Sequence, residues 1–136
     1  MTAITTPRLK ESNDSLLRLA IRADAILSGL AGIAGIPLAG WLAETSGTTK
    51  AFEYSMSAFF VAYGLVVVAL AARPSVRRTG MVLAAGNLLF TVASVVLVLA
   101  DVFPLTTTGV VLTLATGVYT LVFAELQYQG VRRIKA

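Results

Sequence analysis

Four stretches without a single charged residue dominate this chain. They cover residues 25–43, 54–72, 79–100 and 102–124, and they are 19, 19, 22 and 23 residues long. Because about 20 apolar residues in a helix span the hydrocarbon core of a bilayer, each stretch is long enough to cross a membrane. The mean hydropathy of +0.82 and the 57% hydrophobic content exclude an ordinary soluble domain. The sequence therefore predicts an all-α fold, a four-helix transmembrane bundle with short loops that forms one integral membrane domain over residues 1–136.

The basic residues alternate between the two sides of these stretches. Ten of the eleven Lys and Arg lie in the N-terminal segment, in the loop at 73–78 or in the C-terminal tail, and only Lys50 lies in the other set of loops. By the positive-inside rule, both termini are expected in the cytoplasm, with the cations against anionic headgroups of the lipid bilayer. We therefore expect a multipass protein of the cytoplasmic (inner) membrane and no nucleic-acid partner.

Capping residues and helix breakers set the expected boundaries. Asn13, Asp14 and Ser15 are typical N-cap residues, and Asp14 precedes Arg18 by four positions, which favours an ion pair on a helix. Pro37 lies inside the first span, where a kink is expected. The expected organisation is a flexible cytoplasmic N-terminus at 1–14, spans at about 20–43, 54–72, 80–100 and 106–126, and a cytoplasmic tail at 127–136.

A weak internal repeat has an offset of 56 residues. The segment that begins at Tyr63 (YGLVVVAL) aligns with the segment that begins at Tyr119 (YTLVFAEL), and the same offset superposes the first span on the third. Such a repeat predicts two hairpins of two spans each, related by an axis along the membrane normal.

Small residues recur along the first span at intervals of 3, 4, 3 and 4. Small side chains at this spacing let a second helix approach closely, which is how helices associate in lipid. Two interpretations stay open, namely internal packing against the second or fourth span, and a docking face for another subunit or copy. The residues predicted to take part in helix packing are Ala25, Ser28, Gly32, Gly35 and Ala39, with Pro37 in the same span.

Polar residues form a stripe on each of the last two spans. One hypothesis is that the two stripes meet and enclose a hydrated or ligand-binding path. The alternative is that they make interhelical hydrogen bonds and bonds to their own helix carbonyls, as structural glue. The stripe of the third span holds Asn87, Thr91 and Ser94, and that of the fourth holds Thr113, Thr116 and Thr120, with Gln127 further along the same face.

Two acidic residues lie on the side that is otherwise basic. Asp24 begins the first span and Glu125 ends the fourth. An unpaired carboxylate at this depth is costly, so Glu125 is expected to face the bundle and to pair with Arg22 or Arg18. In the alternative hypothesis, Asp24 and Glu125 are proton-exchange groups at the mouth of a path.

The chain contains no Cys and no His, which removes thiolate nucleophiles and the usual ligands of haem, zinc and copper. No nucleophile, phosphate-loop or dinucleotide motif is present. We therefore expect no catalytic residues, no metal site and no cofactor, and a protein that is not an enzyme.

The segments RLAIRADAILSGLAGIAG and VFAELQYQGVRR resemble those of small four-span integral membrane proteins of actinobacteria, which are similar to DoxX-like families in size and layout. This resemblance implies an accessory subunit of a quinone-linked or oxidative-stress complex, with any redox chemistry in a partner. It implies no catalytic residue.

Two functions are consistent with these patterns. The first is a non-enzymatic accessory or scaffolding subunit that forms a homo-oligomer or joins a membrane complex. The second is a small proton-coupled carrier or channel that uses the polar faces of the third and fourth spans with Glu125 or Asp24.

Overall fold

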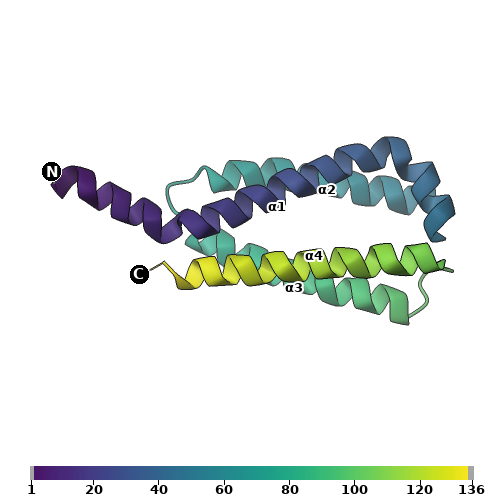
Figure 1. Cartoon of the computed structure of the whole chain (residues 1–136). Coiled ribbons are helices and arrows are strands. Elements are labelled where there is room, and N and C mark those ends of the chain that lie inside the picture. The colour runs from purple at the N-terminus through teal and green to yellow at the C-terminus, as the bar shows by residue number, and fades with distance from the viewer. Residues whose placement is uncertain (1, 135–136) are drawn as a thin grey trace.

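The computed structural model describes residues 2–134, and the side chains of residues 13–134. Within this part of the chain the regular structure is helical, which confirms the all-α prediction. Each helix is long and apolar enough to cross a membrane, α1 from Asn13 onward. The helices are α1 (Thr2–Ser46), α2 (Lys50–Ala71), α3 (Arg77–Leu99) and α4 (Thr107–Arg132) (Figure 1).

The four helices form two antiparallel hairpins that pack asymmetrically. α1 packs closely on α2, α3 packs on α4, and α1 also contacts α4, whereas α2 and α3 make no comparable contact. Both chain ends lie at one end of the bundle together with the connection 72–76, and we call this the termini end (Figure 1). The connections 47–49 and 100–106 lie at the opposite end, which we call the loop end. The gap between α2 and α3 is the place where the bundle is least closed.

Glycines allow the close approach of α1 and α2. A Cβ atom added to Gly32 would lie 2.5 Å from the carbonyl oxygen of Ser57, and one added to Gly64 would lie 2.7 Å from that of Ala25. A Cβ added to Gly35 would collide with the Ser57 side chain. The helix backbones therefore touch directly, which supplies packing contacts that lipid-facing surfaces cannot.

The start of α1 differs from the prediction. The N-cap expected at Asn13–Ser15 lies inside the helix, which extends back to Thr2. The helix also continues through Pro37, whose side chain is exposed on its outer face. The predicted ion pair is confirmed, with Arg18 Nε 3.0 Å from Asp14 Oδ2.

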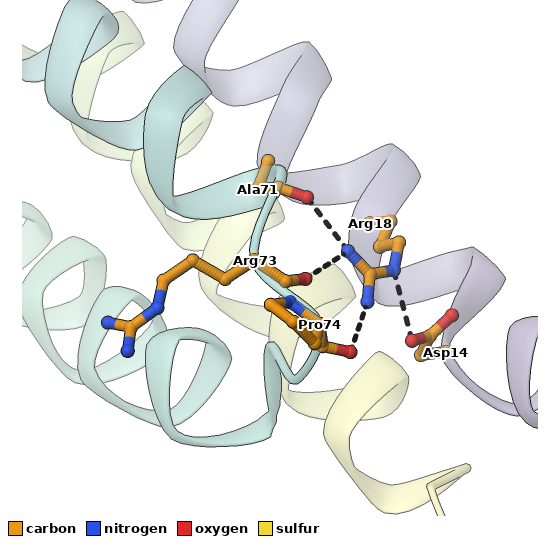
Figure 2. Close-up of polar contacts among 5 residues, drawn as sticks. All are labelled: Asp14, Arg18, Ala71, Arg73 and Pro74. Atoms are coloured by element: carbon orange, nitrogen blue, oxygen red, sulfur yellow. Dashed lines mark hydrogen bonds and ion pairs between the residues drawn. The ribbon is translucent and has the colours of Figure 1, made fainter.

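Arg18 also closes the end of α2. Its guanidinium donates from Nη1 to the carbonyl oxygens of Ala71 at 2.9 Å and Arg73 at 2.7 Å, and from Nη2 to that of Pro74 at 2.7 Å (Figure 2). The last carbonyls of a helix lack partners within it and carry partial negative charge, so a guanidinium stabilises them. This contact fixes the connection 72–76 against α1.

At the loop end, two threonines begin helices and one glycine allows the turn. The side chains of Thr49 and Thr106 accept from the backbone N–H groups of Phe52 and Gly109, both at 3.1 Å. Gly47 has φ +81°, a region that glycine adopts readily. The N–H of Thr106 donates to the carbonyl of Ser46 at 3.0 Å, and this bond joins the two hairpins.

Candidate functional site

Asp24, on α1, is the centre of a buried polar cluster. Its side chain is 0% exposed and accepts five hydrogen bonds. Oδ2 accepts from Tyr63 Oη at 2.7 Å, from Asn87 Nδ2 at 3.0 Å and from Gln127 Nε2 at 3.0 Å. Oδ1 accepts from Ser28 Oγ at 3.1 Å and from Tyr119 Oη at 3.0 Å. This carboxylate is held by all four helices.

The amide groups of the cluster also bind each other. Asn87 Nδ2 donates to Gln127 Oε1 at 2.9 Å as well as to Asp24, so both of its hydrogens are used. Gln127 is 0% exposed. The bond between the two amides fixes both side chains, so that each directs one N–H at the carboxylate.

The donors around Asp24 are hydroxyl and amide groups, none of which carries a positive charge. The one ion pair within residues 13–134 joins Asp14 to Arg18. A buried carboxylate without a cation is costly, since several kcal/mol of desolvation are offset only by hydrogen bonds. Asp24 is therefore a site where a proton or a bound cation can restore neutrality.

A cavity of about 410 Å³ lies beside this cluster and is lined by residues of all four helices. The rings of Phe59 and Phe60 on α2 approach Phe90 on α3, with centroids 6.5 Å and 5.9 Å apart. These rings bridge the gap that the helix backbones leave. Ser28, Tyr63, Asn87 and Tyr119 of the cluster line the cavity, with Leu27, Ala31, Phe59, Phe60, Leu83, Gly86, Phe90, Leu112, Ala115, Thr116 and Thr120. We call it the inner cavity.

A second cavity, of about 360 Å³, continues toward the loop end. It shares Phe60, Phe90, Leu112 and Thr116 with the inner cavity, so the two are adjacent. We call it the outer cavity. Its lining includes Glu53, to which Thr48 donates a hydrogen bond.

Toward the termini end, the bundle is filled by an apolar core. Ile21 and Leu17 of α1 lie about one and two turns from Asp24, and both are fully buried. They pack with Val67, Ala71, Val76, Leu83 and Val131. The cluster at Asp24 therefore lies between a closed apolar end and the two cavities.

The small residues of α1 lie on its buried face. Ala25, Ser28, Gly32, Gly35 and Ala39 are all buried, and the three central ones lie toward α2 or the cluster at Asp24. The closeness of Gly32 and Gly35 to α2 fits the interpretation of internal packing. Pro37 lies on the opposite, exposed face of the helix.

The polar stripes of α3 and α4 meet at a second point besides the bond between Asn87 and Gln127. Thr91 and Thr120 share a hydrogen bond of 2.7 Å between their hydroxyls, and Thr91 also donates to the carbonyl of Gly117 at 3.0 Å. Ser94 and Thr116 donate instead to carbonyls of their own helices. Thr113 and Thr116 line the outer cavity. The stripes thus combine interhelical bonds with cavity lining.

The predicted pairing of Glu125 is wrong. Glu125 is exposed and accepts from Gln129 Nε2 at 2.8 Å, Arg22 is exposed, and Arg18 is bound to Asp14 and the end of α2. The reason is helix periodicity, because Gln127 faces the interior and a residue two positions earlier points about 160° away. Asp24 likewise contacts neutral groups, where the sequence suggested cations within reach.

Tyr63 and Tyr119 are cluster residues that the sequence did not mark as site residues. The signal was present in the internal repeat, where they occupy equivalent positions 56 residues apart. In the structure they donate to the two oxygens of the same carboxylate. The 56-residue offset pairs the two tyrosines in the sequence, but their shared acceptor is visible only in the structure.

Comparisons with models of known families, with curated proteins and with solved structures give no match for this chain. The four apolar helices define a small multipass membrane protein. Large apolar side chains point outward around the bundle, for example Leu65 and Leu89, each 70% exposed, as expected of a surface in contact with lipid.

Proposed function

We propose that this protein is a small proton-coupled carrier that binds a ligand in the inner cavity and exchanges it for a proton at Asp24. The observation that supports this proposal is a fully buried carboxylate, held by five neutral donors, beside a cavity of about 410 Å³. An ionisable residue inside a membrane bundle commonly marks a substrate or proton pathway.

The exchange follows from charge balance. With Asp24 ionised, the cluster carries one negative charge and the adjacent cavity favours a positive ligand. With Asp24 protonated, one donor to the carboxyl group has to turn away and the attraction for the ligand is lost. The titratable side chains that face Asp24 are Tyr63 from α2 and Tyr119 from α4, while α3 contributes the amide of Asn87.

The two cavities supply a route for the ligand from the loop end. Phe60 and Phe90 lie at their common boundary, where rotation of a ring would connect them. The apolar core around Val67 closes the other side of Asp24. A carrier requires this kind of site, open toward one side and closed toward the other, which then reverses.

Single cysteines test the proposal cleanly because the chain has none. In the full-length protein in liposomes, Gly86→Cys places a thiol at an exposed position of the inner-cavity lining, where an added Cβ meets nothing within 4 Å. Val118→Cys, at a position 60% exposed on the outer surface of α4, is the matched lipid-facing control. Methanethiosulfonates react with thiolates, which form in water and not in lipid. With the neutral 2-hydroxyethyl reagent we expect Gly86→Cys to react at least about tenfold faster than Val118→Cys.

The closed end supplies the second half of this test. Val67→Cys lies in the apolar core, at a position 2% exposed. If the core opens during a transport cycle, this thiol reacts more slowly than Gly86→Cys but clearly faster than Val118→Cys. A Gly86→Cys thiol as slow as the control would mean a dry cavity, and a Val67→Cys thiol as slow as the control would mean a permanently closed end. Either result contradicts a carrier.

An accessory role is the second candidate. The supporting observation is a groove of about 360 Å³ on the outside of α3 and α4, lined by Met81, Leu88, Leu121, Tyr128 and the exposed Glu125 among others. A carboxylate on the lipid-facing side of a span would be neutralised by a Lys or Arg on a helix of a partner. Copurification in mild detergent tests this role, since a stoichiometric partner that is lost in Glu125→Gln supports it and its absence contradicts it.

A further inference from the structure

The polar hydrogens around the inner cavity all point away from it. Tyr63, Tyr119 and Ser28 donate to Asp24, and Asn87 donates both amide hydrogens to Asp24 and Gln127. The two threonines of the lining behave in the same way. Thr116 donates to the carbonyl of Leu112, and the hydroxyl of Thr120 has two protein acceptors within reach, the hydroxyl of Thr91 at 2.7 Å and the carbonyl of Gly117 at 3.0 Å. The O–H and N–H groups of the cavity lining therefore donate to protein acceptors, above all to the Asp24 carboxylate, and not into the cavity.

The surface that the inner cavity offers to a ligand therefore consists of hydrogen-bond acceptors and the faces of aromatic rings. We call this surface the wall of the cavity. The tyrosine and serine oxygens and the Asn87 carbonyl oxygen keep lone pairs that a ligand can use, although the Asn87 amide also approaches the Tyr63 hydroxyl and Ser28 lies 3.4 Å from the hydroxyl of Tyr119. The rings of Phe59, Phe60 and Phe90 add the negative faces of their π systems. The lining contains no Lys or Arg, and the charge of Asp24 lies directly behind it.

We propose that the ligand of the inner cavity is an organic ammonium ion with an apolar body, and this inference rests on the proposed function. The ammonium N–H groups would face the oxygens of Tyr63, Asn87 and Tyr119, where the charge of Asp24 is felt most strongly. The apolar body would lie among the phenylalanine rings, which also attract a cation.

The same wall disfavours other ligand classes. A carboxylate or phosphate would meet a negative charge and no free donor. A quinone or another carbonyl compound needs N–H or O–H donors, and those of the lining are committed to protein acceptors. A bare metal ion needs several oxygen ligands, whereas the carboxylate oxygens already accept five hydrogen bonds.

Three probes with the same phenylbutyl body test the choice of head group. 4-Phenylbutylammonium, 4-phenylbutanol and 5-phenylpentanoate are positive, neutral and negative, and their binding to the purified full-length protein is measured by isothermal titration in detergent. We expect the ammonium to bind at least about tenfold more tightly than the alcohol and the carboxylate to bind least. Equal affinity of ammonium and alcohol, or no binding of the ammonium, would overturn the inference.

Variants test whether the preference for the ammonium over the alcohol arises in the inner cavity. Asp24→Asn should bring the ammonium-to-alcohol ratio close to one, whereas Glu125→Gln, a matched loss of an exposed carboxylate, should leave it unchanged. Phe90→Leu keeps the fold accessible if Asp24→Asn does not fold, and it should lower the affinity for the ammonium more than that for the alcohol. If neither Asp24→Asn nor Phe90→Leu changes the ratio of ammonium affinity to alcohol affinity, the ammonium does not bind in the inner cavity.

Charged thiol reagents separate this inference from the carrier proposal. In Gly86→Cys, the 2-trimethylammonioethyl reagent should react at least about tenfold faster than the 2-sulfonatoethyl reagent, after correction for their rates with a free thiol. Reaction with the neutral reagent but no preference for the cation would leave the hydrated cavity in place and overturn the ammonium ligand. No reaction with any of the three would overturn both proposals.

Discussion

The hydroxyl of Tyr63 lies 2.7 Å from Oδ2 of Asp24, and the hydroxyl of Tyr119 lies 3.0 Å from Oδ1 of the same side chain. One tyrosine comes from each hairpin, so the carboxylate joins the two halves of the bundle. The bond to Tyr63 lies within the first hairpin and the bond to Tyr119 joins it to the second, and both hold the carboxylate beside the inner cavity.

Removing either hydroxyl should weaken the bundle. Tyr63→Phe and Tyr119→Phe each delete a donor to a buried charge, which costs about 1.5–3 kcal/mol of unfolding free energy. Thermal or denaturant unfolding in detergent measures the loss. Tyr54→Phe, at an exposed position, is the control and should change stability by less than about 0.5 kcal/mol. If Tyr63→Phe is as stable as the control, the bond to Asp24 is not structural.

Glycine substitutions should distinguish close packing from open space. In Gly64→Ala the new Cβ would lie 2.7 Å from the Ala25 carbonyl oxygen, so we expect a loss of about 1–3 kcal/mol and a lower melting temperature. Gly86→Ala meets nothing within 4 Å, and its higher helix propensity should leave stability unchanged or raise it by up to about 1 kcal/mol. Equal melting temperatures of Gly64→Ala and Gly86→Ala would contradict the close contact between α1 and α2.

The hydroxyl pair between α3 and α4 should be worth little. Hydrogen bonds between membrane helices average about 0.6 kcal/mol, and Thr91 and Thr120 share one of 2.7 Å. A double-mutant cycle with Thr91→Val and Thr120→Val should give a coupling energy of about that size. Thr116→Val, which removes a bond within its own helix, should show no coupling to Thr91→Val. If the coupling energy of Thr91→Val with Thr120→Val equals that of Thr91→Val with Thr116→Val, the two hydroxyls do not stabilise the contact between α3 and α4.

Arg18 should be more important than Arg22 although both precede the same span. Arg18→Lys cannot reproduce the three bonds to the end of α2 together with the bond to Asp14, so we expect a loss of about 1–3 kcal/mol. Arg22→Lys, at an exposed position, should be neutral within about 0.5 kcal/mol. The comparison is made by thermal unfolding in the same detergent, and equal melting temperatures would contradict the cap on α2.

Glu125 and Gln127 should behave in opposite ways. Glu125→Gln should unfold within about 0.5 kcal/mol of the unmodified chain, since the side chain is exposed. Gln127→Leu removes two bonds from the buried network and should cost about 1–3 kcal/mol. Denaturant titrations of both variants measure the difference. A large loss of unfolding free energy in Glu125→Gln would instead support the ion pair with α1 that was predicted from the sequence.

Local patterns predicted much of the fold. The charge-free stretches gave the four helices, and the i, i+4 spacing of Asp14 and Arg18 gave an ion pair found at 3.0 Å. The candidate site was predicted in part. Asp24, Asn87 and Ser28 were named, but Ser28 was assigned to packing and the bonds that Ser28 and Asn87 donate to Asp24 were not predicted. The difference arises because a list of polar residues does not say which of them face each other.

The sequence by itself determined how many helices are long and apolar enough to cross the membrane, where the second and third of them begin and end to within a few residues, and which residues are small enough for close packing. These properties depend on length, hydropathy and spacing within one segment. Only the tertiary structure decided that Asp24 points inward and Glu125 outward, and that five donors from four helices converge on one carboxylate. The physical reason is that helices in lipid are apolar on nearly every face, so hydropathy cannot fix their rotation. That rotation, and the register between helices far apart in the chain, is set by the packing itself.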